Sequence, residues 1–234
     1  LKLGSNNAVV VAEAATANNG QLNIIATATA DDRLITVSGD AKLVVTGLQA
    51  DFDGSKATGS IDITTAANLG DGKGVSITLN AGPATIAGDA ANAGKATVTI
   101  NAANMADDKA LTISGDAAFA ISNLSKGDLV STATQAITVT GGATAQSFTT
   151  ANGADIIDGG DGDDIISAGG GTNTLTGGAG VDTFVIDKDG FAVITDFRNS
   201  GADKLSLSLG DIAFNAGQAV ALTAGSTLTR RGMD

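Results

Sequence analysis

Residues 150–185 read TANGADIID GGDGDDIIS AGGGTNTLT GGAGVDTFV when they are written in groups of nine. Each group repeats a glycine, an Asp or Asn two residues later, and a large apolar residue two residues after that. The glycines are Gly153, Gly162, Gly171 and Gly180; the Asp or Asn residues are Asp155, Asp164, Asn173 and Asp182; the apolar residues are Ile157, Ile166, Leu175 and Phe184. Three columns that stay in phase over four groups indicate a structural repeat of nine residues.

This pattern resembles the nonapeptide Gly-Gly-x-Gly-x-Asp-x-apolar-x of the RTX (repeats-in-toxin) family. The resemblance implies a right-handed parallel β-roll, or β-helix, in which the apolar residue points inward and the glycines turn the chain. Two nonapeptides then form one coil of about eighteen residues. Turns two groups apart stack on each other, which places Asp155 over Asn173 and Asp164 over Asp182.

The stacked turns predict a calcium site. Carboxylates stacked about 4.8 Å apart repel each other unless a cation lies between them. Ca²⁺ takes six to eight oxygens, which aspartates and the carbonyls of the glycine turns can supply. We expect Asp164 with Asp182 to form the strongest site, Asp155 with Asn173 a weaker one, and Gln146 with Asp164 the weakest. The predicted metal-binding residues of the repeats are Asp155, Asp164, Asn173, Asp182, Gly153, Gly160, Gly162, Gly171, Gly178 and Gly180.

The segment after the repeats resembles the one that closes the RTX roll in secreted serralysin-type proteases and S-layer proteins. It contains Ile-Thr-Asp-Phe at 194–197 and Gly-Ala-Asp-Lys-Leu at 201–205. The resemblance implies that Asp196 helps to hold the last calcium ion. An equally open alternative is a hydrophobic cap, in which Phe191 and Phe197 cover the end of the roll.

The composition excludes several functions. The 234 residues include 32 glycines and no Cys or His, and 25 acidic residues stand against 13 basic ones. Disulfides, zinc fingers and His-dependent catalytic triads are therefore excluded, and we expect no enzymatic activity. A net charge of −12 disfavours nucleic acid as a partner. Glu13 is the only glutamate, so an EF-hand, which needs a bidentate Glu, is excluded, and we interpret Asp51–Gly54 as a turn.

Short runs rich in Val, Ile and Thr predict strands along the whole chain, so the fold class is all-β. Residues 36–48 match residues 112–124 at an offset of 76, and 61–64 match 137–140 at the same offset. We predict three regions: a repetitive β-solenoid or β-sandwich-like part at 1–130, the calcium-binding roll with its closing segment at 131–198, and a strand-rich cap or secretion-signal region at 199–234. No run is long enough for a transmembrane segment.

The resemblance implies a protein that is exported by type I secretion and folds outside the cell with Ca²⁺ as its cofactor. The upstream strands resemble the body of RTX-type S-layer proteins and surface adhesins. We therefore expect a structural protein of the cell surface that assembles with itself into a lattice. The alternatives are an adhesin or biofilm protein, which takes cell-surface polysaccharide as its partner, and the C-terminal secretion module of a hydrolase. Because the chain begins at Leu1, we expect it to be a piece of a longer or processed protein.

Overall fold

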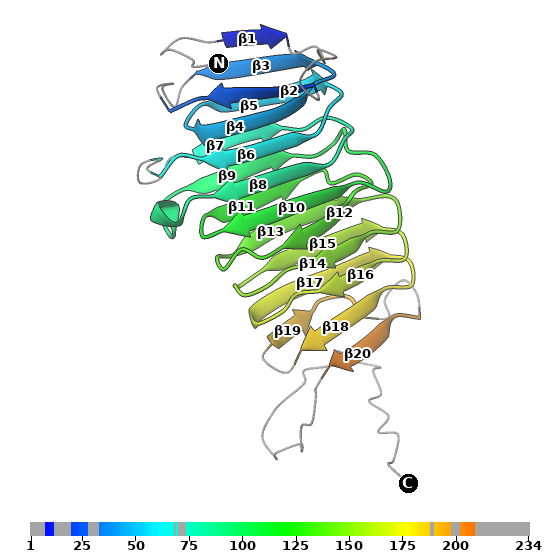
Figure 1. Cartoon of the computed structure of the whole chain (residues 1–234). Coiled ribbons are helices and arrows are strands. Elements are labelled where there is room, and N and C mark those ends of the chain that lie inside the picture. The colour runs from blue at the N-terminus through cyan, green and yellow to red at the C-terminus, as the bar shows by residue number, and fades with distance from the viewer. Residues whose placement is uncertain are drawn as a thin grey trace.

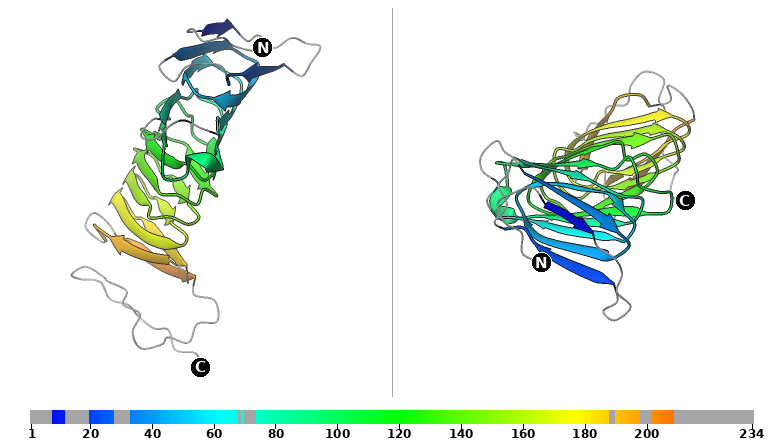
Figure 2. Two further views of the ribbon diagram at one scale, coloured as in Figure 1. Left: turned by 90° about the vertical axis from the view of Figure 1, so that its left-hand side faces the viewer. Right: turned by 90° about the horizontal axis from the view of Figure 1, so that it is seen from above.

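The computed structural model describes residues 8–11, 20–27, 33–67, 69, 74–187, 190–197 and 202–208. These residues form an elongated parallel β-solenoid with two 10-stranded sheets (Figure 1). Successive strands alternate between the sheets, and the strands stack along one long axis with β1 and β20 at opposite ends (Figure 2). The predicted all-β solenoid is confirmed. Residues 209–234, most of the predicted secretion-signal region, lie outside the described residues.

The odd-numbered strands form one sheet: β1 (Ala8–Val11), β3 (Leu34–Gly39), β5 (Asp51–Ala57), β7 (Gly74–Thr78), β9 (Thr97–Asn101), β11 (Ala118–Ser122), β13 (Ile137–Gly142), β15 (Ile156–Asp161), β17 (Gly171–Ala179) and β19 (Gly190–Ile194). The even-numbered strands form the other: β2 (Gln21–Ile25), β4 (Lys42–Leu48), β6 (Ile61–Thr65), β8 (Ala84–Gly88), β10 (Ala110–Gly115), β12 (Asp128–Ser131), β14 (Ser147–Thr149), β16 (Ile165–Ser167), β18 (Thr183–Asp187) and β20 (Lys204–Ser208). A 3₁₀ turn covers Ala90–Asn92. No helix among the described residues has both the length and the apolar character needed to cross a bilayer.

The nine-residue repeat sets the strand register. Ile157 pairs with Leu175 in one sheet, and Ile166 pairs with Phe184 in the other. Each pair is two nonapeptides apart, so the predicted coil of eighteen residues is confirmed. Both sheets continue across residue 130, because β11 pairs with β13 and β12 pairs with β14. The three predicted regions stay a prediction.

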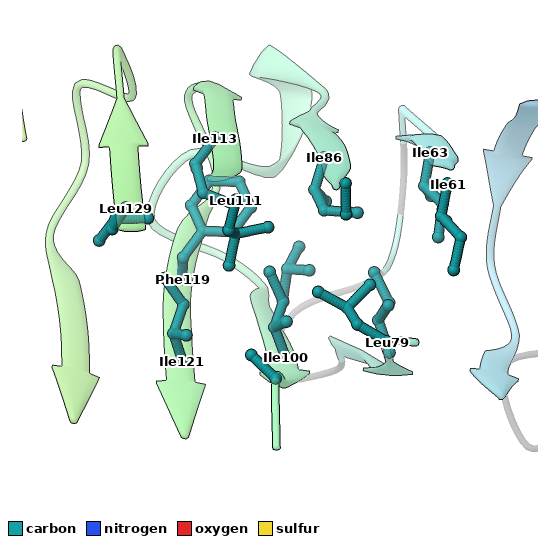
Figure 3. Packing of buried hydrophobic residues seen from close by; sticks show 14 of the residues in the cluster. Ile61, Ile63, Leu79, Ile86, Ile100, Leu111, Ile113, Phe119, Ile121 and Leu129 are labelled. Atoms are coloured by element: carbon teal, nitrogen blue, oxygen red, sulfur yellow. The ribbon is translucent and has the colours of Figure 1, made fainter. Parts of the chain in front are cut away.

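The core is a narrow layer between the two sheets. Period-two alternation puts one side chain of each pair inside, so that Ile157 is fully buried while its neighbour Ile156 is 51% exposed. Large aliphatic residues from facing strands fill the layer, among them Ile86, Ile100 and Leu111 (Figure 3). In the repeats each coil contributes one large buried residue from each sheet, so the core there is one side chain deep per strand.

The interpretation of Asp51–Gly54 as a turn is wrong, because these residues begin β5. Phe52 is 1% exposed and pairs in register with Ile35 and Ile77 of the flanking strands. Burial of this aromatic ring outweighs the preference of Asp and Gly for turns. Asp51 and Asp53 lie on the outer face of the sheet, where both are partly exposed and accept backbone hydrogen bonds from Ser76 and Ser55.

The 76-residue match corresponds to a corner of the solenoid. Residues 36–48 span β3, a turn and β4, and residues 112–124 span β10, a turn and β11. The turn glycines Gly39 and Gly115 both have positive φ, at 107° and 89°. The first strand of the corner lies in the odd sheet in one copy and in the even sheet in the other. The match therefore repeats a strand–turn–strand unit after seven strands, and not a whole number of coils.

Upstream turns are held by buried amide side chains. Asn92 is 1% exposed, and its Nδ2 donates a 2.7 Å hydrogen bond to the carbonyl of Ala66. Its Oδ1 accepts from the backbone N–H of Leu69 at 3.0 Å. Asn80 closes another turn in the same way, with Nδ2 donating to the carbonyl of Gly59 and Oδ1 accepting from the N–H of Gly82. These turns satisfy their backbone groups with side chains of the chain itself.

We expect Asn92→Ala to lower the free energy of unfolding by about 1–3 kcal/mol, because it leaves a buried carbonyl and a buried N–H without partners. Denaturant unfolding followed by circular dichroism in saturating calcium measures the change. Asn101→Ala is the matched control, since Asn101 accepts a hydrogen bond from Ala103 at a more exposed position. An equal effect of the two substitutions would contradict the assignment of Asn92 as a buried bridge.

Candidate metal centre

The four Asp and Asn residues of the repeat column lie inside the turns. Asp155, Asp164, Asn173 and Asp182 are each at most 1% exposed. Each side chain reaches the turn of the preceding coil: Oδ1 of Asn173 accepts from the N–H of Asp155 at 2.9 Å, and Oδ1 of Asp182 accepts from the N–H of Asp164 at 2.9 Å. The predicted stacking of Asp155 with Asn173 and of Asp164 with Asp182 is confirmed.

The two stacked pairs differ in the hydrogen bonding of the second carboxylate oxygen, Oδ2. Within the described residues, Oδ2 of Asp164 and Oδ2 of Asp182 are buried and have no hydrogen-bond partner. Oδ2 of Asp155, in contrast, accepts a 2.6 Å hydrogen bond from the hydroxyl of Thr150. A buried carboxylate oxygen without a partner costs free energy unless a cation or proton neutralises it. Asp164 and Asp182 therefore need a positive charge that no residue in the described part of the chain supplies.

Both unpartnered oxygens lie against glycine. A Cβ at Gly159 would overlap Oδ2 of Asp164, and a Cβ at Gly177 would overlap Oδ2 of Asp182. The six predicted site glycines all have positive φ: Gly153 at 146°, Gly160 at 96°, Gly162 at 113°, Gly171 at 101°, Gly178 at 98° and Gly180 at 140°. These backbone angles and close approaches leave no room for a side chain at the turn glycines, and a Cβ at Gly159 would also overlap the carbonyl oxygen of Gly177.

The charges around Asp164 and Asp182 favour a cation. Burial, together with the negative charges of Asp182, Asp163 and Asp158, raises the pKa of Asp164 to about 7, although the hydrogen bond from the N–H of Gln146 lowers it. Burial also raises the pKa of Asp182, with added repulsion from Asp203 and Asp196. A bound divalent cation would stabilise the charged form of both carboxylates and so lower their pKa values again.

The donor set fits Ca²⁺. Every side-chain atom that could bind the ion is an oxygen, which is the ligand that hard cations prefer. Among the described residues no three carboxylates converge closely enough to hold an ion by themselves. Asp164 and Asp182 would hold the ion together with carbonyls of the glycine turns, which matches the preference of Ca²⁺ for mixed carboxylate and carbonyl ligands.

Asp196 accepts hydrogen bonds from the glycine turn of the preceding coil. Its Oδ1 accepts from the N–H of Gly177 at 3.0 Å and its Oδ2 accepts from the N–H of Gly178 at 2.7 Å. It therefore caps the glycine turn through hydrogen bonds, and its role as a calcium ligand stays a prediction. Of the two residues of the alternative hydrophobic cap, Phe197 packs against the core with its ring 6.1 Å from that of Phe184, whereas Phe191 is 45% exposed. The cap itself stays a prediction.

Asp203 continues the column and was not predicted. It is 9% exposed, and its Oδ1 accepts from the N–H of Asp182 at 3.1 Å. The step from Asp182 is 21 residues, so Asp203 falls out of the nine-residue frame. The signal that could have found it is the Asp-x-apolar pattern of 203–205, since Leu205 pairs with Phe184 in register.

The fold and this site define a parallel β-solenoid with oxygen-lined turns. The sequence matches the RTX calcium-binding nonapeptide repeat, in four copies, over residues 149–184. No curated protein and no solved structure matches the chain. The chain therefore carries RTX calcium-binding repeats at the place where the structure leaves two buried carboxylate oxygens unpartnered.

Proposed function

We propose that this chain is part of a secreted structural protein of the cell surface that folds with calcium and assembles into an S-layer-like lattice. The observation that carries the calcium dependence is the pair of unpartnered oxygens on Asp164 and Asp182. In a cytosol with little free calcium, the carboxylates of Asp164 and Asp182 repel each other, and the chain stays competent for type I secretion. Outside the cell, calcium at roughly 10⁻⁴–10⁻³ M drives folding of the repeats.

Exposed apolar residues on both sheets support lateral assembly. Parallel sheets are usually covered on both faces, yet the outer faces of this solenoid carry large apolar residues. Ile156 and Val193 are 51% and 42% exposed on the odd sheet, and Ile165 and Val130 are 49% and 42% exposed on the even sheet. A second molecule could cover either face. A structural role without catalysis remains our proposal for the whole chain.

Negative-stain electron microscopy of the purified chain tests the proposal. We expect ordered two-dimensional arrays in millimolar Ca²⁺ that dissolve when a chelator is added. Calcium binding without any array would overturn the lattice and favour the adhesin or the hydrolase module. A chain that binds no calcium by calorimetry would overturn the proposal entirely.

A further inference from the structure

The turns of the repeats lie along two edges of the solenoid. One edge, which we name the acidic edge, carries the side chains that precede strands of the even sheet: Gln146, Asp164, Asp182 and Asp203. The other, which we name the closed edge, carries Asp155, before β15, and Asn173, at the start of β17. The Asp and Asn side chains of both edges form the same ladder, in which each accepts from an N–H of the preceding coil.

On the closed edge every side-chain atom of the column has a partner. Asp155 accepts from the N–H of Ile137 at 2.8 Å through Oδ1 and from the hydroxyl of Thr150 at 2.6 Å through Oδ2. Asn173 accepts from the N–H of Asp155 through Oδ1, and its Nδ2 donates to the carbonyl of Ala168 at 3.2 Å. These bonds satisfy both carboxylate oxygens of Asp155 and both polar atoms of the Asn173 amide without a metal ion.

The difference arises from the hydroxyl of Thr150 and from the side-chain amide of Asn173. Five residues before the column residue, the closed edge has Thr150 and Ala168, whereas the acidic edge has Gly159 and Gly177. Thr150 supplies a hydroxyl to its column residue, and Ala168 supplies a carbonyl. Gly159 and Gly177 supply nothing to the second oxygen, which stays buried and unpartnered.

Gln146 ends the acidic edge on its upstream side. Its Nε2 donates to the carbonyls of Leu124 at 2.7 Å and Gly127 at 2.6 Å, and its Oε1 accepts from the N–H of Gly142 at 2.7 Å. The amide thus occupies with its own hydrogens a set of inward carbonyls that would otherwise be free to face a cation. The side chain is 3% exposed and fully satisfied, so the turn above Asp164 needs no metal.

We propose that calcium binds along the acidic edge only, downstream of Gln146, and that the closed edge takes none because its own hydroxyl and amide groups replace the ion. The proposal rests on the calcium-binding function above and narrows it. Each coil of the repeats is then held by calcium on one side and by hydrogen bonds on the other. Asp155 and Asn173, which we predicted as a weaker site, become structural residues.

Calorimetric titration of the full chain with Ca²⁺ tests this proposal. We expect Asp164→Asn and Asp182→Asn each to weaken binding at least about tenfold or to remove bound calcium. Asp155→Asn is the matched control, because it makes the same change on the closed edge and imitates Asn173. We expect it to leave the number of bound ions unchanged and the affinity within about twofold, since a hydrogen-bonded carboxylate is not a ligand there.

A loss of calcium in Asp155→Asn equal to that in Asp164→Asn would overturn the one-edge proposal, while the wild-type chain would still bind calcium. A crystal of the wild-type chain with a lanthanide in place of calcium gives an independent answer that does not depend on how the variants fold. Anomalous peaks beside Asp164 and Asp182 alone support the proposal, and a peak beside Asp155 overturns it. If the wild-type chain binds neither ion, the proposed function itself fails.

Discussion

Removal of calcium is expected to abolish most of the amide-exchange protection of β14–β18 while β4–β10 keep theirs. Without the ion, Asp164 and Asp182 are two buried carboxyl groups on successive coils, each with an unpartnered oxygen, and burial disfavours their charged forms. Separating the two coils exposes these groups to water and so removes the cost of burying them, but it breaks the strand pairs around them. Upstream, Asn80 and Asn92 satisfy their turns with amide hydrogens, so the same relief is not needed there.

Hydrogen exchange followed by mass spectrometry, with and without a chelator, measures this difference strand by strand. Because coils of a solenoid contact only their neighbours, loss in the repeats should fade over the adjacent coils and should not spread through the whole chain. Magnesium added back in place of calcium is a suitable control, since Mg²⁺ demands a smaller and stricter octahedral site. Equal protection of β14–β18 in both conditions would refute the calcium requirement.

Gly178→Ala is expected to prevent folding of β15–β18. Gly178 has φ of 98°, and a Cβ there would overlap the carbonyl oxygen of Gly160 in the neighbouring coil. The overlapping atom is backbone within a paired strand, so it cannot move without breaking the ladder between β15 and β17. We expect a cost of several kcal/mol, well above the roughly 1–2 kcal/mol of a left-handed residue alone.

Gly94→Ala separates the two contributions. Gly94 also has positive φ, at 67°, but a Cβ at this position would meet nothing within 4 Å. We expect this control to retain the full far-UV spectrum and to lose about 1–2 kcal/mol of unfolding free energy. Thermal unfolding of both variants in saturating calcium makes the comparison. A Gly178→Ala protein as stable as Gly94→Ala would show that the coils are not packed as closely as the structure has them.

The positions that local spacing misjudged share a cause. Asp51–Gly54 has turn-forming residues, but Phe52 completes the core between Ile35 and Ile77, and its burial decides the conformation. Asp203 lies 21 residues from Asp182 instead of 18, so the nine-residue frame passes over it. In both cases a neighbouring coil supplies the decisive contact, and that contact is not visible in the local pattern.

The nine-residue spacing by itself determined the coil length, the inward column of Ile157, Ile166, Leu175 and Phe184, and which aspartates stack. Each of these depends only on the period of glycine, Asp and apolar residues along the chain. The tertiary structure alone decided which stacked residues still need a cation. Asp155 and Asp164 occupy the same place in the repeat, yet a hydroxyl satisfies the second oxygen of Asp155, whereas that of Asp164 faces glycine backbone. Hydrogen-bond satisfaction depends on atoms that meet in space, and the repeat pattern does not record it.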